Sequence, residues 1–135
     1  MSLTKMTFVF TCLFTVSAWA QSDKIARGKY LVEEVARCQE CHTPKSADGQ
    51  FDQTKWLKGA TLNIQAIAEV KGWHKTSPDI TSTSRLFQRW GDAGLIKFLT
   101  TAQNPNGGAA GAPMPAYKMA PADAEAVVEY LKSLK

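Results

Sequence analysis

The residues of this chain best suited to chemistry form a run of five, Cys38-Gln39-Glu40-Cys41-His42. Two cysteines three positions apart on a helical turn face the same way, so both thiols can add to the two vinyl groups on one edge of a porphyrin. The residue that follows then turns its imidazole toward the porphyrin iron. This CXXCH pattern predicts one covalently attached haem c, with Cys38 and Cys41 as thioethers and His42 as the proximal iron ligand.

Two other interpretations of a Cys-X-X-Cys pair are a dithiol redox motif and half of a zinc site, which would need two more soft ligands. The sequence has three cysteines and two histidines in all. The third cysteine, Cys12, falls in a segment that we expect to be removed, so His74 alone remains outside the motif. This inventory favours haem attachment over both alternatives.

The first twenty residues have the pattern of a secretory signal peptide. Lys5 gives a positive start, Met6 to Ser17 is almost wholly apolar or hydroxylated, and Ala18-Trp19-Ala20 is a small-X-small cleavage signal. A retained membrane anchor is the alternative, but an apolar run of this length is short of the roughly 20 helical residues that cross a bilayer. We therefore predict a signal peptide at 1–20 and one monohaem domain at 21–135. Because haem c is attached outside the cytoplasm, the predicted location is the periplasm.

Helical patterns flank a long irregular middle. Apolar residues at helical spacing predict a first helix from Asp23 to about Arg37, which leads directly into the haem motif. The stretch from Thr43 to Ser84 has scattered Gly, Pro, Asp and Lys. Its apolar patch, Leu62 to Val70, is expected to form a weak helix or a loop that wraps the ring.

A second helix is predicted to start near Asp92, a plausible N-cap, and to end before the breaker at residues 104–108. Its apolar side consists of Leu95, Ile96, Phe98 and Leu99.

The last helix is predicted to begin at Pro121, a residue suited to the first helical position. Its apolar content is Val127, Val128, Tyr130, Leu131 and Leu134. We expect the first and last helices to pack on each other. A close crossing would explain Gly28, which costs about 1 kcal/mol relative to Ala inside a helix.

The sixth iron ligand separates electron transfer from chemistry at the iron. Met114, Met119 and His74 are the candidates, and an open site is the fourth possibility. Met114 is favoured because Pro115 holds it in an extended conformation on a stiffened loop. Met119 is explained better as an apolar residue just before the last helix, packed on its first turns. A thioether ligand favours ferrous iron and raises the reduction potential.

At this point the chain resembles a class I c-type cytochrome, and more narrowly the single-haem bacterial domains that accompany periplasmic dehydrogenases. The resemblance covers nearly all of residues 21–135. It rests on an ordered series of segments: Arg27-Gly28-Lys29-Tyr30-Leu31-Val32, Cys38 to Pro44, Trp56-Leu57-Lys58-Gly59-Ala60, Pro78-Asp79-Ile80-Thr81, Pro113-Met114-Pro115 and Tyr130-Leu131-Lys132-Ser133-Leu134.

The resemblance implies an all-α cytochrome c fold around haem, with crossed terminal helices and with His42 and Met114 as the axial ligands. Two departures stand out. Arg85 to Trp90 replaces a glycine turn of such proteins, and Thr100 stands where they often have arginine. The haem propionate partner is therefore open among Arg85, Arg89 and Trp56, each of which is equally well explained as a solvated charge or a core aromatic.

The predicted function is that of a periplasmic one-electron carrier, not an enzyme, between a dehydrogenase and a respiratory acceptor. A haem enzyme or gas sensor with a displaceable sixth ligand is the alternative, and a haem-bearing subunit of a larger complex is a third. A formal net charge of +4, which includes Lys5, does not indicate nucleic acid as a partner. No stable membrane insertion is expected. Six lysines either steer an acidic redox partner or are ordinary surface charges: 45, 55, 58, 71, 75 and 118.

Overall fold

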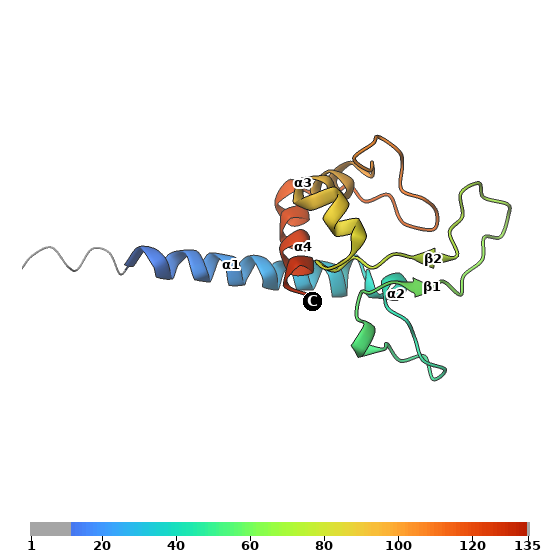
Figure 1. The fold of residues 1–135 in the computed structure, drawn as a ribbon, viewed down its shortest axis with the longest axis horizontal. Helices are drawn as coiled ribbons and strands as arrows, with labels where there is room; N and C mark the ends of the chain where they lie inside the picture. Colours follow the sequence, from blue (N-terminus) through green and yellow to red (C-terminus); the bar gives the residue numbers. More distant parts are fainter. Residues whose placement is uncertain (1–11, 135) are drawn as a thin grey trace, which may run out of the picture.

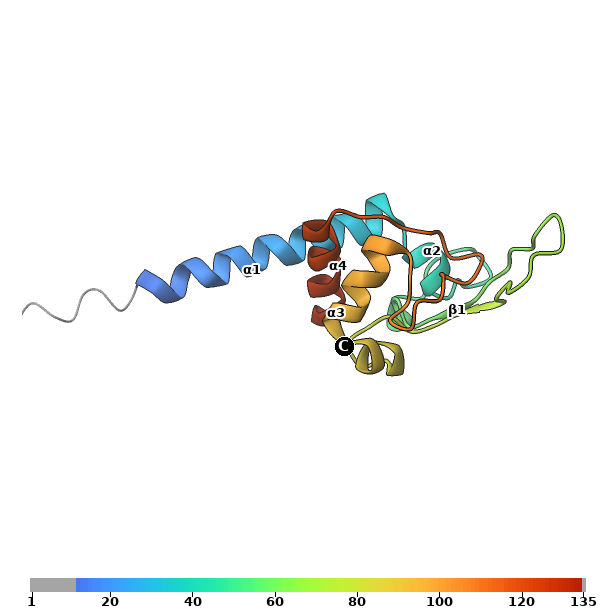
Figure 2. The same ribbon diagram turned by 90° about the horizontal axis from the view of Figure 1, so that it is seen from above.

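The computed structural model describes residues 12–134, which form a mostly helical domain (Figures 1 and 2). In chain order the elements are α1 (Cys12–Tyr30), the π-helical turn η1 (Leu31–Val35), α2 (Gln39–His42), the 3-10 turn η2 (Gln53–Lys55), β1 (Ala60–Thr61), β2 (Thr76–Ser77), α3 (Arg85–Thr101) and α4 (Pro121–Ser133). The predicted all-α cytochrome c fold is confirmed, with one short antiparallel strand pair added.

The predicted crossing of the first and last helices is present, with α1 against α4 (Figure 1). Gly28 lies at the crossing, where an added Cβ would be 1.9 Å from the Ala126 carbonyl oxygen and 2.7 Å from Tyr130 Cβ. No larger residue fits unless the helices move apart. The predicted role of this glycine is therefore confirmed, and its cost in helix propensity is offset by close packing.

The first helix differs from the predicted span of Asp23 to Arg37. It begins at Cys12, because the residues before Asp23 contain no helix breaker, and it ends at Tyr30. The π-helical turn Leu31–Val35 follows, and Arg37 adopts a left-handed conformation with φ 51°. These features close the helix and start the chain in a new direction at the haem motif.

The predicted helix from near Asp92 is present, but it is joined to a preceding helical segment, so that α3 as a whole begins at Arg85. Ser84 is the cap, because its Oγ accepts a hydrogen bond from the Phe87 backbone N–H at 3.0 Å. The helix is interrupted at Gly91, with φ 61° and ψ −179°, so a new helical segment starts next to Asp92. The Asp92 carboxylate instead accepts a hydrogen bond from Lys132 Nζ at 2.8 Å.

The last helix begins at Pro121, as predicted, and buries one continuous apolar face. Its buried residues are Ala124, Ala126, Val127, Val128, Tyr130 and Leu131. They form the core with Leu31 and Val32 of η1 and with Phe87, Leu95 and Leu99 of α3. The end of α1, α3 and α4 thus make a packed scaffold on one side of the haem motif.

The middle of the chain is a loop region and not a helix at Leu62 to Val70. Those residues lie in the long connection between β1 and β2, and Ile67 at its tip is fully exposed. Without a buried apolar face, nothing stabilises a helix there. The connection is closed at its base by the hydrogen bond from the Leu62 N–H to the Lys75 carbonyl, 2.8 Å. This outcome matches the loop alternative of the prediction.

Residues 1–11 lie outside the described part, and with them Lys5 and the start of the predicted signal peptide. The described helix α1 runs through position 20 without a break. Among residues 12–134, none of the helices combines the length and hydropathy needed to cross a bilayer. The division at residues 20 and 21 stays a prediction.

Candidate functional site

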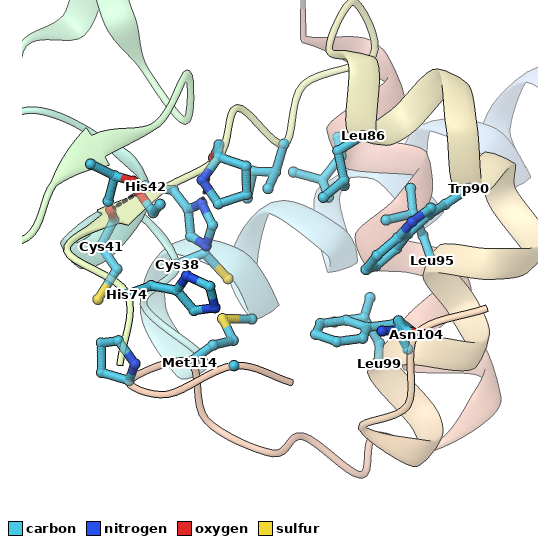
Figure 3. A pocket seen from close by; sticks show the side chains of 18 of the residues that line it. Cys38, Cys41, His42, His74, Leu86, Trp90, Leu95, Leu99, Asn104 and Met114 are labelled. Atoms are coloured by element: carbon cyan, nitrogen blue, oxygen red, sulfur yellow. Dashed lines mark hydrogen bonds between the residues drawn. The ribbon is translucent and has the colours of Figure 1, made fainter. Parts of the chain in front are cut away.

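The CXXCH motif comprises the short helix α2 and its N-cap, Cys38, and it presents the side chains of Cys38, Cys41 and His42 to one cavity (Figure 3). His42 is 5% exposed, and its Nδ1 lies 2.8 Å from the Pro78 carbonyl oxygen. A carbonyl can only accept, so Nδ1 carries the proton and Nε2 is left with its lone pair. Burial lowers the pKa of His42, which favours the neutral imidazole that a metal ligand must be.

Three further hydrogen bonds fix the backbone around His42. Gly59 donates its N–H to the His42 carbonyl at 2.8 Å. Ser77 Oγ donates to the Cys41 carbonyl at 2.5 Å and accepts the Ala60 N–H at 2.9 Å. These groups come from the two strands and from Gly59 just before β1, so the small sheet and its entry support the motif.

Cys38 and Cys41 are not joined to each other and both line the cavity. Burial raises the pKa of the Cys38 thiol to about 11. A redox-active dithiol needs a thiolate with a depressed pKa, and Cys38 has the opposite environment. Within residues 12–134, no group of three or more His, Cys, Asp or Glu side chains gathers as a metal site requires. The pair is placed to react with a bound group and not to form a dithiol or zinc centre.

The cavity measures about 490 Å³ and its far wall is apolar. This wall is built from α3 and α4 by Leu86, Trp90, Leu95, Phe98, Leu99, Val127 and Leu131. Two thiols and one imidazole thus face a broad apolar space bounded by helices. The donor set and the cavity together fit a covalently attached haem.

Met114 and His74 line this cavity, so two of the three predicted sixth-ligand candidates come together there (Figure 3). Met114 is half-buried, on a turn in which its N–H donates to the Gly111 carbonyl at 3.0 Å. Met119, the third candidate, packs against the core just before α4 and donates its N–H to the Leu99 carbonyl. This position agrees with the prediction that Met119 is a packing residue just before the last helix.

The three proposed propionate partners lie away from the described cavity lining. Arg85 and Arg89 are exposed on α3. Trp56 stacks edge-on against Phe51, with ring centroids 5.8 Å apart. The assignment of a propionate partner stays a prediction.

Of the six lysines expected around the haem, two are paired with carboxylates. Lys45 Nζ is 2.7 Å from Glu40 Oε2, and Lys55 Nζ is 3.8 Å from Asp52 Oδ2. The remaining four, Lys58, Lys71, Lys75 and Lys118, are exposed. The basic charge offered to a partner therefore rests mainly on these four.

Sequence reasoning assigned no role to the Pro78 carbonyl or to the first turns of α3. Pro78 belongs to a segment that carried the family resemblance. Its contact with His42 is made by the backbone carbonyl oxygen, an atom that every residue has. Leu86 and Trp90 enter the cavity wall because the helix starts at Arg85. The i, i+4 spacing of Leu86 and Trp90 was the sequence pattern that could have placed both side chains on one face of a helix.

Comparisons with known proteins show the family of this chain. A family model described as "Cytochrome c" matches residues 25–135. The chain is 32% identical over 119 residues to the fructose dehydrogenase cytochrome subunit of Gluconobacter japonicus, which covers 84% of this chain and 22% of that protein.

Two further curated relatives are similar at the same level. One is a diheme cytochrome c-type protein of Cereibacter sphaeroides, 31% identical over 111 residues, with 78% of this chain and 34% of the relative covered. The other is the gluconate 2-dehydrogenase cytochrome c subunit of Pantoea cypripedii, 31% identical over 131 residues, with 85% and 27% covered. The chain thus spans between 22% and 34% of the length of these relatives.

Proposed function

Because the chain belongs to the cytochrome c family, whose domain binds covalently attached haem c, we propose that it carries single electrons from a dehydrogenase to a respiratory acceptor. In this proposal Cys38 and Cys41 hold the porphyrin as thioethers, while His42 and Met114 ligate its iron. When bound, haem supplies a metal centre that gains and loses one electron at a time. The protein supplies the ligands, the burial and the contact surface.

The observation that carries the proposal is the fixed orientation of His42. Its Nδ1–H donates to the Pro78 carbonyl, so Nε2 is directed into the cavity that Met114 also lines. Such a second partner sets the tautomer and the ring orientation of a histidine ligand. A six-coordinate electron-transfer site is supported by four side chains that line one apolar cavity. They are His42 with its fixed ring, the thiols of Cys38 and Cys41, and the thioether of Met114.

The apolar wall and the thioether act in the same direction on the reduction potential. A low-dielectric surrounding disfavours the additional positive charge of ferric iron, and a soft neutral ligand favours the ferrous state. Filling both axial positions also keeps small molecules off the iron. These properties suit a carrier better than a peroxidase or gas sensor.

The proposed donor is a dehydrogenase, since two of the relatives are named as cytochrome subunits of dehydrogenases. The connection between β1 and β2 offers a contact surface, because Ile64 and Lys75 line one hollow there and Ile67 and Lys71 are also exposed. An apolar centre with a basic rim suits a small transient interface with an acidic partner. Electron-transfer rates with such a partner are expected to fall as the salt concentration rises.

The proposed location is the periplasm, reached through a signal peptide at residues 1–20. This part of the proposal rests on the amino-acid pattern and on the chemistry of haem c attachment. Mass spectrometry of the exported protein tests it directly. The expected chain begins at Gln21 and carries the mass of one haem, whereas an unprocessed chain would overturn the processing step.

The decisive test is an absorption spectrum of the haem-loaded protein, oxidised and reduced, beside the variant Met114→Ala. Ferric iron bound to a methionine sulfur has a weak far-red band. We expect that band in the native protein and its loss in the variant, with Met119→Ala unchanged as the matched control. A native protein that is high-spin and lacks the band would overturn the carrier proposal and favour chemistry at an open iron.

A further inference from the structure

His74 shares the cavity with Met114, and the two are linked through the backbone. The His74 N–H donates to the Ala112 carbonyl at 2.7 Å, which ties the strand entering β2 to the loop that carries the thioether. Figure 3 shows the His74 imidazole among the cavity side chains, close to Met114 in that view. Both side chains thus come from adjoining segments on the same side of the site.

Gly111 leaves room for this imidazole. A Cβ at position 111 would be 2.3 Å from His74 Nε2 and 2.5 Å from its Cδ2, so the ring rests directly on the glycine backbone. The Met114 N–H donates to the carbonyl of the same glycine at 3.0 Å. One short turn therefore carries the thioether and also seats the imidazole. A side chain at position 111 would take the space that the ring occupies.

The two histidines of the cavity differ in how they are held. The ring of His42 is anchored through Nδ1 to the Pro78 carbonyl. Within the described chain, no hydrogen bond or ion pair engages the ring of His74, and that residue is exposed. An imidazole with both nitrogens unengaged, beside a metal-binding thioether, is free to swing toward the metal.

We propose that His74 is a reserve axial ligand, which binds the haem iron through a ring nitrogen when the Met114 sulfur leaves. This inference rests on the proposed function. The step is a ligand substitution: an iron–sulfur bond breaks, an iron–nitrogen bond forms, and no electron is transferred. Its consequence is that loss of the thioether leaves the iron six-coordinate, with a lower reduction potential, because histidine does not favour ferrous iron as methionine does.

The experiment compares four haem-loaded proteins: native, His74→Ala, Met114→Ala and the double variant. We expect His74→Ala to keep the far-red band of the native protein. Met114→Ala is expected to lose that band, remain low-spin with the paramagnetic resonance signal of two imidazoles, and bind carbon monoxide slowly. The double variant is expected to become high-spin and to bind carbon monoxide rapidly.

A high-spin Met114→Ala protein with full haem content would overturn the reserve-ligand proposal while leaving Met114 as the native ligand. Lys75 is the neighbouring basic group that could mimic the result, so Met114→Ala/Lys75→Ala is the matched control. This control is expected to stay low-spin, and a high-spin spectrum there would assign the ligand to the lysine. Absence of the far-red band in the native protein would instead contradict the proposed function. Haem content by mass and far-ultraviolet circular dichroism confirm that each variant is folded.

Discussion

The helix crossing and the loop region around residues 43–84 and 102–119 are held together in different ways. At the crossing, α1 and η1 meet α4 through a continuous set of buried apolar side chains, with Val32 and Ala124 at 0% exposure. In the loop region, Leu57 is the one buried apolar side chain among the described residues. The loops are joined instead by single hydrogen bonds, such as those that reach Pro78, Ser77 and Ala112.

The loop region therefore has too little apolar contact of its own to be stable. Its inner surface faces a cavity of about 490 Å³, whose opposite wall is the helical core. A haem in that cavity would be the apolar core of the loops as well as the redox centre. The helices need the haem less, because they bury their apolar faces against one another.

The largest effect on stability is expected from removing the haem. The haem-free protein is the double variant Cys38→Ala/Cys41→Ala, purified without cofactor. Without the haem the loops lose the apolar surface that they would pack against, whereas the α1–α4 crossing keeps its own buried side chains. We expect amide hydrogen exchange to show complete loss of protection in the loops and partial protection at the α1–α4 crossing. Protected loop amides in the haem-free chain would contradict the difference between the two regions.

Gly28→Ala tests the helix crossing in the haem-loaded protein. The new Cβ would meet the Ala126 carbonyl oxygen at 1.9 Å, so the helices must separate. We expect a loss of about 3 kcal/mol in the free energy of unfolding, the upper part of the range for overpacking. Denaturant unfolding measures it. Ala26→Val, on the exposed face of the same helix, is the control and is expected to change the stability by less than ~1 kcal/mol. Equal effects of the two substitutions would argue against a close crossing.

Thr43→Val tests the hydrogen bonds of the loop region. Thr43 is 1% exposed, and its Oγ1 accepts the Leu57 N–H at 2.9 Å. Valine has nearly the same shape but leaves that buried N–H without an acceptor, which costs about 1–3 kcal/mol. The same substitution at exposed Thr61 is the control, expected to be close to neutral. Unfolding curves that overlay for native and Thr43→Val protein would show that the loops do not depend on single hydrogen bonds.

The smallest effect is a dependence on pH that involves both regions. Burial raises the pKa of Tyr130, at the crossing, and of Tyr117, in the loops, to about 12, from 10.0 in the unfolded chain. The folded state favours the protonated phenols, so their contribution is complete below pH 10 and is lost as the pH rises toward 12. The Tyr130 hydroxyl also donates to Glu33 at 2.5 Å. Tyr130→Phe is therefore expected to flatten the fall in stability between pH 10 and 12. An unchanged slope in both Tyr130→Phe and Tyr117→Phe would contradict these shifts.

Features that depend on local spacing were predictable from the sequence. The CXXCH motif identified the cavity thiols and His42, and Pro121 marked the start of α4. Gly28, unfavourable inside a helix, indicated a close crossing. Each of these signals lies within a few residues of the feature it predicts. Met114, favoured from the neighbouring Pro115 and again by the family resemblance, lines the cavity.

Features that depend on distant backbone atoms were not predictable. The partner of His42 is a carbonyl 36 positions away, and a carbonyl carries no sequence signal. The seating of His74 on Gly111 likewise joins two loops whose paths depend on the whole fold. The start of α3 was missed because Asp92 has the character of a cap, whereas Ser84 makes the capping hydrogen bond.

The pair β1–β2 has a consequence for how such a domain can vary in length. Its base is fixed, because Ser77 and Pro78 support the iron-binding motif and His74 is tied to Ala112. Its tip, around the fully exposed Ile67, has no such obligations. Insertions and deletions near residue 67 are thus expected to be tolerated, while a single deletion between positions 74 and 78 would disturb the contacts with Cys41, His42 and Ala112 at once. The length of the connection can therefore change at its tip without altering the walls of the cavity.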